Sequence, residues 1–146
     1  MPIYYVISET SCMIARVFLD TNVVAYSLTD DENKKAIAEG LLSNRPWVSV
    51  QVINELVNVC IRKFGFSHEA ALSAGRMVMR LCEVASMEAQ DVEQAFQISE
   101  RFRFSHWDSL ILAVALRHGC ETVFSENMQH GQKVGVGLRI INPFIR

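Results

Sequence analysis

The strongest constraint on the fold is the alternation of short apolar runs with longer segments of helical periodicity. Short β-type runs occupy residues 16–20, 46–50, 81–85, 121–124 and 138–142. Between them, residues 51–64 place apolar side chains on one helical face, and residues 109–118 are apolar on nearly all sides. Strands that alternate with helices indicate parallel β-α units with right-handed crossovers. We therefore predict an α/β fold, a three-layer α/β/α sandwich with a central parallel sheet of about five strands.

Local signals indicate where several helices begin and end. A Thr-x-x-Glu capping box starts at Thr29, and Ser67 and Ser105 are each suited to cap the helix that follows. Gly65 and Gly119 come directly after helical segments, where a residue with left-handed backbone commonly ends a helix. The segments follow one another without a long linker or an internal repeat.

The length of 146 residues fits one domain. Met13 opens a segment typical of a domain that begins with a strand, so we predict a single domain over residues 13–146. Residues 1–12 are predicted to be an N-terminal extension, with Met13 as the alternative natural start. The sequence has neither a signal-peptide pattern nor an apolar run long enough to span a bilayer, so we expect a cytoplasmic protein without membrane contact.

The cysteines and the net charge exclude some classes of function. Cysteines stand at positions 12, 60, 82 and 120 without metal-finger spacing, so we expect reduced, buried thiols. The formal net charge is −2, whereas proteins that hold nucleic acid by charge alone are strongly basic. Any contact with a polyanion must therefore be local or carried by a bound cation.

Acidic residues stand at the predicted strand ends and helix starts. Asp20 ends the first strand, Asp108 opens the apolar helix, and Glu55 lies early in the helix of residues 51–64. In open parallel sheets the functional crevice lies at the carboxyl ends of the strands. Each acid also has an ordinary interpretation: Asp20 suits an N-cap, and Asp108 suits a capping box with Ser105. Glu55 fits a solvated helix face.

Two further polar residues, Glu126 and Asn127, follow the predicted strand of residues 121–124. The fold would bring up to four acids to one edge of the sheet. Clustered carboxylates repel one another unless a cation neutralises them. Hard oxygen ligands suit Mg²⁺ or Mn²⁺, and the sequence has no His/Cys set for zinc and no glycine-rich phosphate loop.

These segments resemble the sequence motifs of PIN-domain ribonucleases, and in particular the VapC-type toxins of type II toxin–antitoxin systems. The resemblance covers about residues 13–146, with the motifs in the expected order. The four motifs are Val-Phe-Leu-Asp-Thr-Asn at 17–22, Asn-Glu-Leu at 54–56, Phe-Ser-His-Trp-Asp-Ser-Leu-Ile at 104–111 and Phe-Ser-Glu-Asn-Met-Gln-His-Gly at 124–131.

The resemblance implies that Asp20, Glu55 and Asp108 are catalytic residues that hold a metal ion. It also implies that Thr21 and Asn22 steady the first loop, and Ser105 belongs to the third motif as a supporting residue. The fourth motif departs from its branch of the family, where an Asp usually stands at the position of Asn127. An amide offers a carbonyl oxygen but no charge, which weakens the case for a second metal ion. Glu126 is the alternative ligand there.

As a member of this family, the protein is expected to be a Mg²⁺-dependent endoribonuclease, with Mn²⁺ as a substitute. The family also implies an RNA substrate, a small cognate antitoxin protein and a homodimer. Two alternatives keep the fold: a module that binds RNA or protein with weak or no catalysis, and a nuclease outside a toxin operon. A receiver-type signalling domain does not fit, because Asp20 lacks an acidic neighbour and the run at 81–85 ends without Asp.

Overall fold

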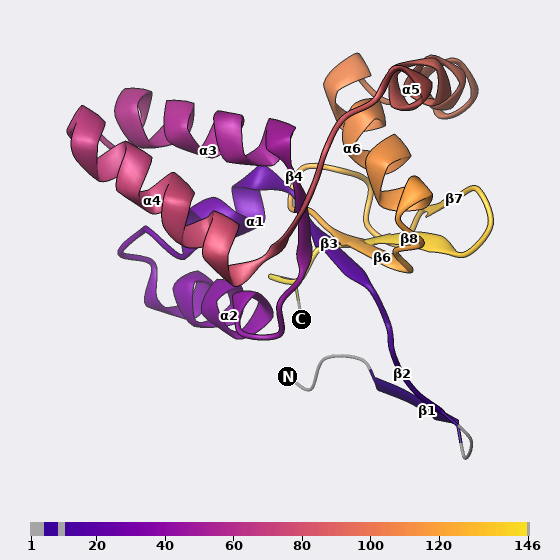
Figure 1. Ribbon diagram of the computed structural model, residues 1–146, viewed down its shortest axis with the longest axis horizontal. Helices are drawn as coiled ribbons and strands as arrows, with labels where there is room; N and C mark the ends of the chain where they lie inside the picture. The colour runs from indigo at the N-terminus through magenta and orange to yellow at the C-terminus, as the bar shows by residue number, and fades with distance from the viewer. Residues whose placement is uncertain (1–4, 9–10, 146) are drawn as a thin grey trace.

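The computed structural model describes residues 5–8 and 11–145, with side chains from residue 15 onward. Its main sheet has six strands in the order β5-β4-β3-β6-β8-β7 (Figure 1). All neighbouring strands are parallel except β7, which pairs antiparallel with β8. This confirms the predicted α/β fold with a mostly parallel sheet, to which β7 adds a short edge strand. The strands are β3 (Val17–Leu19), β4 (Trp47–Ser49), β5 (Glu83–Ala85), β6 (Thr122–Phe124), β7 (Lys133–Val134) and β8 (Leu138–Ile141).

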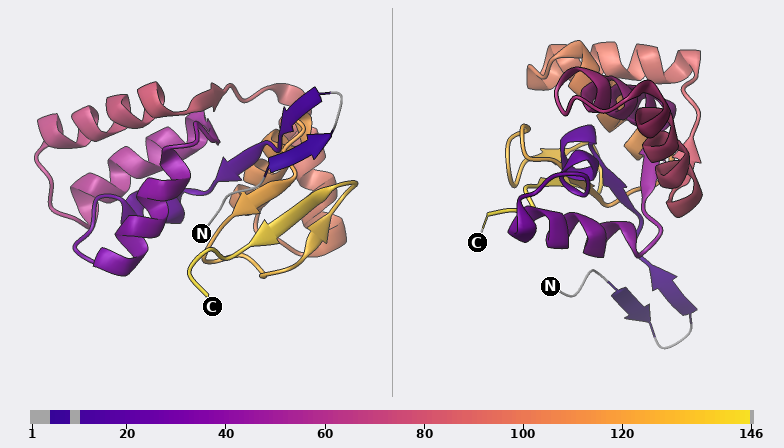
Figure 2. Two further views of the ribbon diagram at one scale, coloured as in Figure 1. Left: turned by 90° about the horizontal axis from the view of Figure 1, so that it is seen from below. Right: turned by 90° about the vertical axis from the view of Figure 1, so that its left-hand side faces the viewer.

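Helices flank the sheet (Figures 1 and 2). Helix α5 packs along α6 and α3 packs along α4, while α1 contacts both α2 and α3. The apolar centre of α6 is buried from Ser109 to Ala115, as its sequence predicts. The helices are α1 (Thr21–Tyr26), α2 (Glu32–Leu42), α3 (Val50–Arg62), α4 (His68–Leu81), α5 (Ala89–Phe102) and α6 (His106–Arg117).

Most of the predicted helix starts are confirmed. The Ser67 hydroxyl accepts a hydrogen bond from the Ala70 amide, and Ser105 caps α6 in the same way. The capping box at Thr29 is wrong, because the N-cap of α2 is Asp31, whose carboxylate accepts from the Lys34 amide at 3.2 Å. The Thr29 hydroxyl instead donates to the carbonyl oxygen of Tyr26 at 2.9 Å, so Thr29 belongs to the turn that ends α1.

The N-terminal segment contains two short strands, β1 (Tyr5–Ser8) and β2 (Ser11–Ile14), which pair antiparallel in a sheet of their own. Residues 1–4 and 9–10 of the expected extension lie outside the described residues. The boundary between an extension at 1–12 and a domain at 13–146 therefore stays a prediction. Within the described part of the chain, no helix is long and apolar enough to cross a membrane.

The described cysteines are reduced and buried, as expected, and the Cys12 side chain lies outside the described side chains. Burial raises the pKa of the Cys82 and Cys120 thiols to about 12, so both stay protonated at neutral pH. They belong to the hydrophobic core together with the buried side chains of β3, β6 and α6. These thiols are structural, because a protonated thiol is a poor nucleophile and a poor metal ligand.

Candidate active site

A cleft of about 630 Å³ lies where β3 ends and α1 begins. Its walls come from the starts of α1 and α6, from α3 and from the turn after β6. This arrangement follows from the strand order, because β3 lies between β4 and β6 and the Asp20 amide donates to the Phe124 carbonyl oxygen at 3.0 Å. Among the predicted site residues, those that line the cleft are Asp20, Thr21, Asn22, Glu55, Asp108, Glu126 and Asn127.

Asp20 combines both interpretations of its position, since it is the N-cap of α1 and also lines the cleft. Its Oδ1 accepts from the Thr21 amide at 2.7 Å. Its Oδ2 accepts from the Ser125 hydroxyl at 2.8 Å and from the Asn22 side-chain amide at 3.1 Å. The side chain is only 5% exposed, so these donors hold a nearly buried carboxylate in one orientation.

Glu55 is half-buried in the cleft and does not lie on a solvated face. Its Oε2 accepts from the Thr21 hydroxyl at 2.6 Å, which links α3 to the start of α1. Its Oε1 accepts from the Gln51 side-chain amide at 2.8 Å, one helical turn earlier. The helical pattern alone does not predict this, because the deciding contact comes from a residue 34 positions away.

Asp108 enters the cleft from the first turn of α6. The capping role at this helix belongs to Ser105, whose hydroxyl accepts from the Asp108 backbone amide at 3.2 Å. Ser105 itself is exposed and does not line the cleft, so it supports the site only by capping α6. The apolar body of α6 is fixed in the core, so the Asp108 carboxylate is presented by a rigid element.

The acids of the cleft perturb one another. Burial raises the pKa of Asp20 from 3.8 to about 6, opposed by the hydrogen bonds from Ser125 and Thr21, and the charges of Asp108 and Glu55 add to the rise. Burial also raises the pKa of Asp108, with a further contribution from Glu55. Like charges held in a low-dielectric site cost free energy that a bound cation would recover. Perturbed pKa values of this kind are typical of functional sites.

The carboxylates do not form a preformed metal cage. Within the part of the chain that the structure describes, no group of three His, Cys, Asp or Glu side chains is close enough to share an ion. Such a cage is not needed for Mg²⁺, which keeps several water ligands and usually binds through one or two carboxylates. One or two of the carboxylates of Asp20, Glu55 and Asp108, completed by water ligands, therefore fit a partly hydrated divalent cation.

Glu126 is engaged elsewhere in the cleft. Its carboxylate accepts from the Tyr26 hydroxyl and from the Lys34 ammonium, both at 2.6 Å. The Lys34 ammonium also lies 4.5 Å from the centre of the Tyr26 ring. Although burial opposes it, Lys34 and Tyr26 hold the pKa of Glu126 below its ordinary value. Its charge is already compensated, which makes Glu126 a weak candidate for a second metal ligand.

Asn22 joins the first and fourth motifs. Its side-chain amide donates to Asp20, and its Oδ1 accepts from the Glu126 backbone amide at 3.0 Å. Asn127 is exposed at the rim of the cleft, and its backbone amide donates to the Ser125 hydroxyl at 3.3 Å. The Ser125 hydroxyl therefore accepts a hydrogen bond from the turn after β6 and donates one to the Asp20 carboxylate. The sequence interpretation missed this role. The place of Ser125 directly after a buried strand was the available signal.

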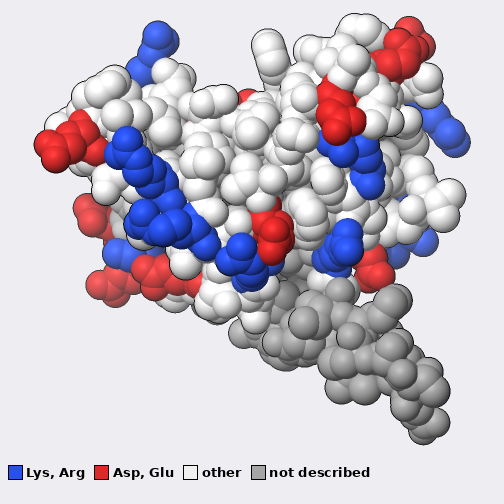
Figure 3. Space-filling view, in the orientation of Figure 1, with Lys and Arg blue, Asp and Glu red and all other residues white. Residues whose placement is uncertain are grey.

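Positive charge is sparse around the cleft. On the face shown in Figure 3, Lys and Arg side chains form a short stripe over α4, and acids are scattered elsewhere on that face. Lys63 is a cation that lines the cleft, and it forms no ion pair with another described residue.

Comparisons with known proteins agree with this architecture. The sequence model of the family described as "PIN domain" matches residues 17–132, which include the residues that line the cleft. A search of curated proteins finds no match.

Several solved structures share the fold. VapC20 of Mycobacterium tuberculosis, described as a sarcin-ricin loop cleaving toxin, matches with a TM-score of 0.63 and 22% identity over 76% of this chain and 89% of that one. DNA-bound VapBC from Salmonella typhimurium matches with a TM-score of 0.65 and 21% identity, over 87% of this chain and 97% of that one. A toxin–antitoxin complex from Klebsiella pneumoniae matches with a TM-score of 0.67 and 17% identity, over 88% of this chain and 98% of that one. At these identities the likeness shows the fold.

Proposed function

Because this chain belongs to the PIN-domain family, we propose that it is a divalent-metal-dependent endoribonuclease and the toxin of a toxin–antitoxin pair. One observation carries the proposal. Asp20, Glu55 and Asp108 come from separate segments of the chain and line one cleft. In that cleft burial and the neighbouring carboxylates raise the pKa of Asp20 and of Asp108, which favours a bound cation.

Asp20, Glu55 and Asp108 would hold the ion, which is Mg²⁺, or Mn²⁺ as a substitute. A divalent cation at this position supplies charge neutralisation for the scissile phosphate and acidifies bound water. Asn127 offers a neutral oxygen at the rim, so the proposal requires one ion and does not depend on a second.

The chain's own residues orient these ligands. Ser125 and Thr21 hold the Asp20 carboxylate, and the Thr21 hydroxyl and the Gln51 amide hold the two oxygens of Glu55. Such positioning keeps the ligands in one geometry before the substrate arrives. Lys63 lines the same cleft and is placed to contact a phosphate of the RNA backbone.

Hydrolysis in this cleft uses water as the nucleophile. The described cysteines, Cys60, Cys82 and Cys120, are buried with raised thiol pKa values, and the residues that line the cleft include no histidine. In-line attack by water on the phosphorus breaks the bond to the 3′ oxygen and leaves a 5′-phosphate and a 3′-hydroxyl. These product ends identify the reaction.

The test is cleavage of transfer and ribosomal RNA by the purified protein with Mg²⁺, with EDTA as the metal-free arm. We expect Mg²⁺-dependent cleavage that Asp20→Asn and Asp108→Asn each abolish while the fold is kept. Asp30→Asn is the matched control, because it makes the same change at an exposed position outside the cleft and should cleave normally. Cleavage that survives in both cleft variants would refute the metal site.

A binding module without catalysis is the second candidate function. It is favoured by the neutral Asn127 and by the pairing of Glu126 with Lys34, which leave fewer free charges in the cleft than a site for two ions requires. In that case the folded protein binds RNA, and Mg²⁺ produces no turnover. A processing nuclease outside a toxin operon would cleave in the same assay but would lack a small neighbouring antitoxin gene.

The proposal includes a small antitoxin that binds over the cleft. Two of the similar structures named above are toxin–antitoxin or VapBC complexes, which supports a protein partner of this kind. Large apolar side chains are exposed on α4 and α5 and offer surface for an antitoxin or for a homodimer: Leu72, Met79 and Phe96. Sedimentation of the purified protein, alone and with the product of the adjacent small gene, tests both associations. The toxin would act in the cytoplasm, where its RNA substrates are.

A further inference from the structure

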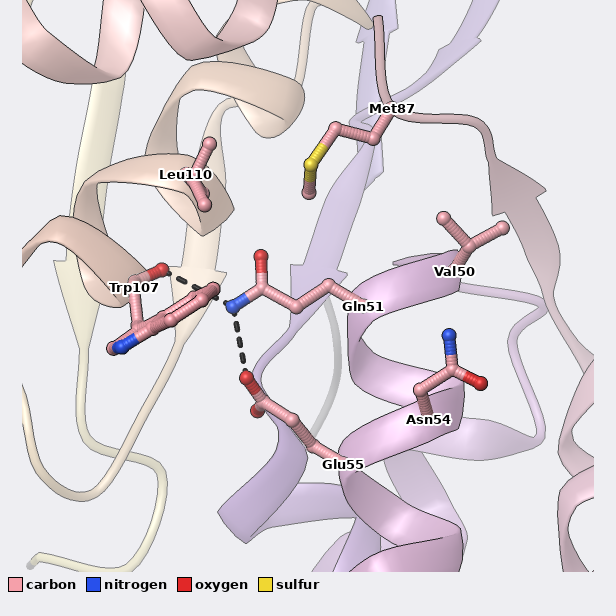
Figure 4. A pocket seen from close by; sticks show the side chains of 7 residues that line it. All are labelled: Val50, Gln51, Asn54, Glu55, Met87, Trp107 and Leu110. Atoms are coloured by element: carbon pink, nitrogen blue, oxygen red, sulfur yellow. Dashed lines mark hydrogen bonds between the residues drawn. The ribbon is translucent and has the colours of Figure 1, made fainter.

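A second cavity, of about 510 Å³, adjoins the acidic cleft and shares Glu55 with it. It lies between the first turns of α3, the start of α6 and Met87 in the segment before α5 (Figure 4). Its volume falls in the range of pockets that bind small organic groups. Its lining is Val50, Gln51, Asn54, Glu55, Met87, Trp107 and Leu110.

Gln51 presents a buried acceptor in this cavity. Its Nε2 donates to Glu55 Oε1 at 2.8 Å and to the Trp107 carbonyl oxygen at 3.2 Å. Both partners are acceptors only, so a flip of the Gln51 side-chain amide would place its oxygen against two other oxygens. The Oε1 atom, which points toward Met87 and Leu110 in Figure 4, is buried and has no hydrogen-bond partner within the described part of the chain. Buried acceptors usually have a hydrogen-bond donor from protein or water, so this atom lacks a partner that a bound molecule could supply.

Trp107 gives the cavity an exposed aromatic wall. It is 65% exposed although it is the largest apolar side chain in the lining. Its ring contacts the imidazole of His106 edge-on, with 5.4 Å between the ring centroids. Trp107 directly precedes Asp108, so the aromatic wall and the third carboxylate of the cleft stand on the same turn of α6.

We propose that this cavity binds a nucleobase of the RNA, stacked on Trp107 and donating an N–H to Gln51 Oε1. The inference rests on the proposed function, because the phosphate attached to that nucleotide would lie toward the acidic cleft. A base matches the two features together, since it is flat and aromatic and carries donors on its edge. Stacking on an exposed aromatic side chain is a common way to hold single-stranded nucleic acid.

The shared Glu55 couples the two sites. Gln51 bridges Glu55 and the Trp107 backbone, so it connects the base cavity to a proposed metal ligand. A base that engages Gln51 therefore acts on a residue that also orients Glu55. Through this contact, the cavity is expected to select which nucleotide lies next to the cleaved bond.

The first experiment measures base binding without catalysis. The wild-type protein in EDTA is titrated with adenosine 5′-monophosphate, and the indole N–H of Trp107 and the side-chain amide of Gln51 are followed by NMR. Ribose 5-phosphate is the probe without a base. Purine-riboside 5′-monophosphate keeps the stacking surface but lacks the exocyclic amino donor. We expect shifts at both side chains with adenosine monophosphate, binding weaker by roughly 2- to 10-fold without the amino group, and no shift with the sugar phosphate.

Variants locate the site. Trp107→Ala should weaken binding of adenosine monophosphate by roughly 5- to 100-fold, and Trp107→Phe should retain most of it. Val136→Ala is the control, because Val136 is a fully exposed apolar residue that does not line this cavity. Equal affinity for the sugar phosphate, or full binding by Trp107→Ala, would overturn the inference. Trp107 signals that shift with protein concentration alone would also overturn it, in favour of a contact between two copies.

The outcome is separable from that of the nuclease assay. Base binding at Trp107 without Mg²⁺-dependent cleavage would support the cavity and refute the nuclease. Cleavage by the wild type, with Trp107→Ala equally active at limiting RNA, would support the nuclease and refute the cavity.

Discussion

Replacing Asp20 with asparagine should stabilise the protein while it removes the proposed activity. The Asp20 carboxyl is 5% exposed, and its pKa rises from 3.8 to about 6 in the folded protein, chiefly because of burial. At about 1.4 kcal/mol for each pH unit, ionisation of this group costs the folded state up to about 3 kcal/mol at neutral pH. Asparagine keeps an acceptor for the Thr21 amide but makes poorer contacts with Ser125 and Asn22. We therefore expect a net gain of about 1–3 kcal/mol.

The pH dependence distinguishes this cause from a packing effect. Since the folded protein binds the Asp20 proton more tightly than the unfolded chain, the wild type gains stability from this group as the pH falls. That contribution is complete below about 4 and is lost as the pH rises through about 6. The advantage of Asp20→Asn should therefore be largest at pH 8 and close to zero near pH 4, where the wild-type carboxyl is protonated.

The assay is thermal unfolding in EDTA at several pH values, for the wild type, Asp20→Asn and the exposed control Asp30→Asn. A gain of 1–3 kcal/mol corresponds to a rise in Tm of roughly 3–10 °C at pH 8, whereas the control should stay within about 0.5 kcal/mol. Addition of Mg²⁺ should raise the Tm of the wild type and leave Asp20→Asn unchanged. A lower Tm of Asp20→Asn at pH 8, or a difference that is the same at pH 8 and pH 4, would refute the reasoning.

Three further predictions concern other parts of the molecule. Arg117→Met should destabilise the fold by about 3–5 kcal/mol in denaturant unfolding, because it leaves the 2% exposed Asp91 carboxylate without its 2.7 Å partner. The double variant with Asp91→Asn should recover part of that loss, and no recovery would contradict the charge argument. Thr21→Val should lower cleavage by roughly 10-fold through misplacement of Glu55, with little change in Tm, and unaltered cleavage would argue against the positioning role. In the native protein at pH 8, the buried thiols should resist alkylation until the chain unfolds, as read by mass spectrometry. These are Cys60, Cys82 and Cys120.

The sequence predicts the elements well because their signals are local. Ser67 and Ser105 each cap the helix that follows them, and the apolar centre of α6 is buried as its composition indicates. The Thr29 capping box fails because a competing local hydrogen bond forms in its place. The preceding helix α1 ends at Tyr26, whose carbonyl oxygen accepts a hydrogen bond from the Thr29 hydroxyl. The next helix therefore has Asp31 as its N-cap.

The candidate site is only partly predictable from sequence. Asp20 and Asp108 follow from the rule that strand ends and buried helix starts face the crevice. Glu55 does not follow from its helical pattern, which shows the face that packs on the core and not the neighbour that approaches from α1. The pairing of Lys34 with Glu126 is still less predictable, since the two residues are 92 positions apart and each would be expected on a solvated surface.

The position of β3 in the sheet has a consequence for when the cleft can form during synthesis. One of the two neighbours of β3 in the sheet is β6, which follows it about a hundred residues later in the chain. At roughly 5–20 residues per second, the ribosome needs several seconds to add that partner. Until then the Asp20 amide lacks the Phe124 carbonyl and the Asp20 carboxylate lacks Ser125. A nascent chain therefore carries Asp20 without a cleft, and the cleft forms only after β6 and the turn that follows it have emerged.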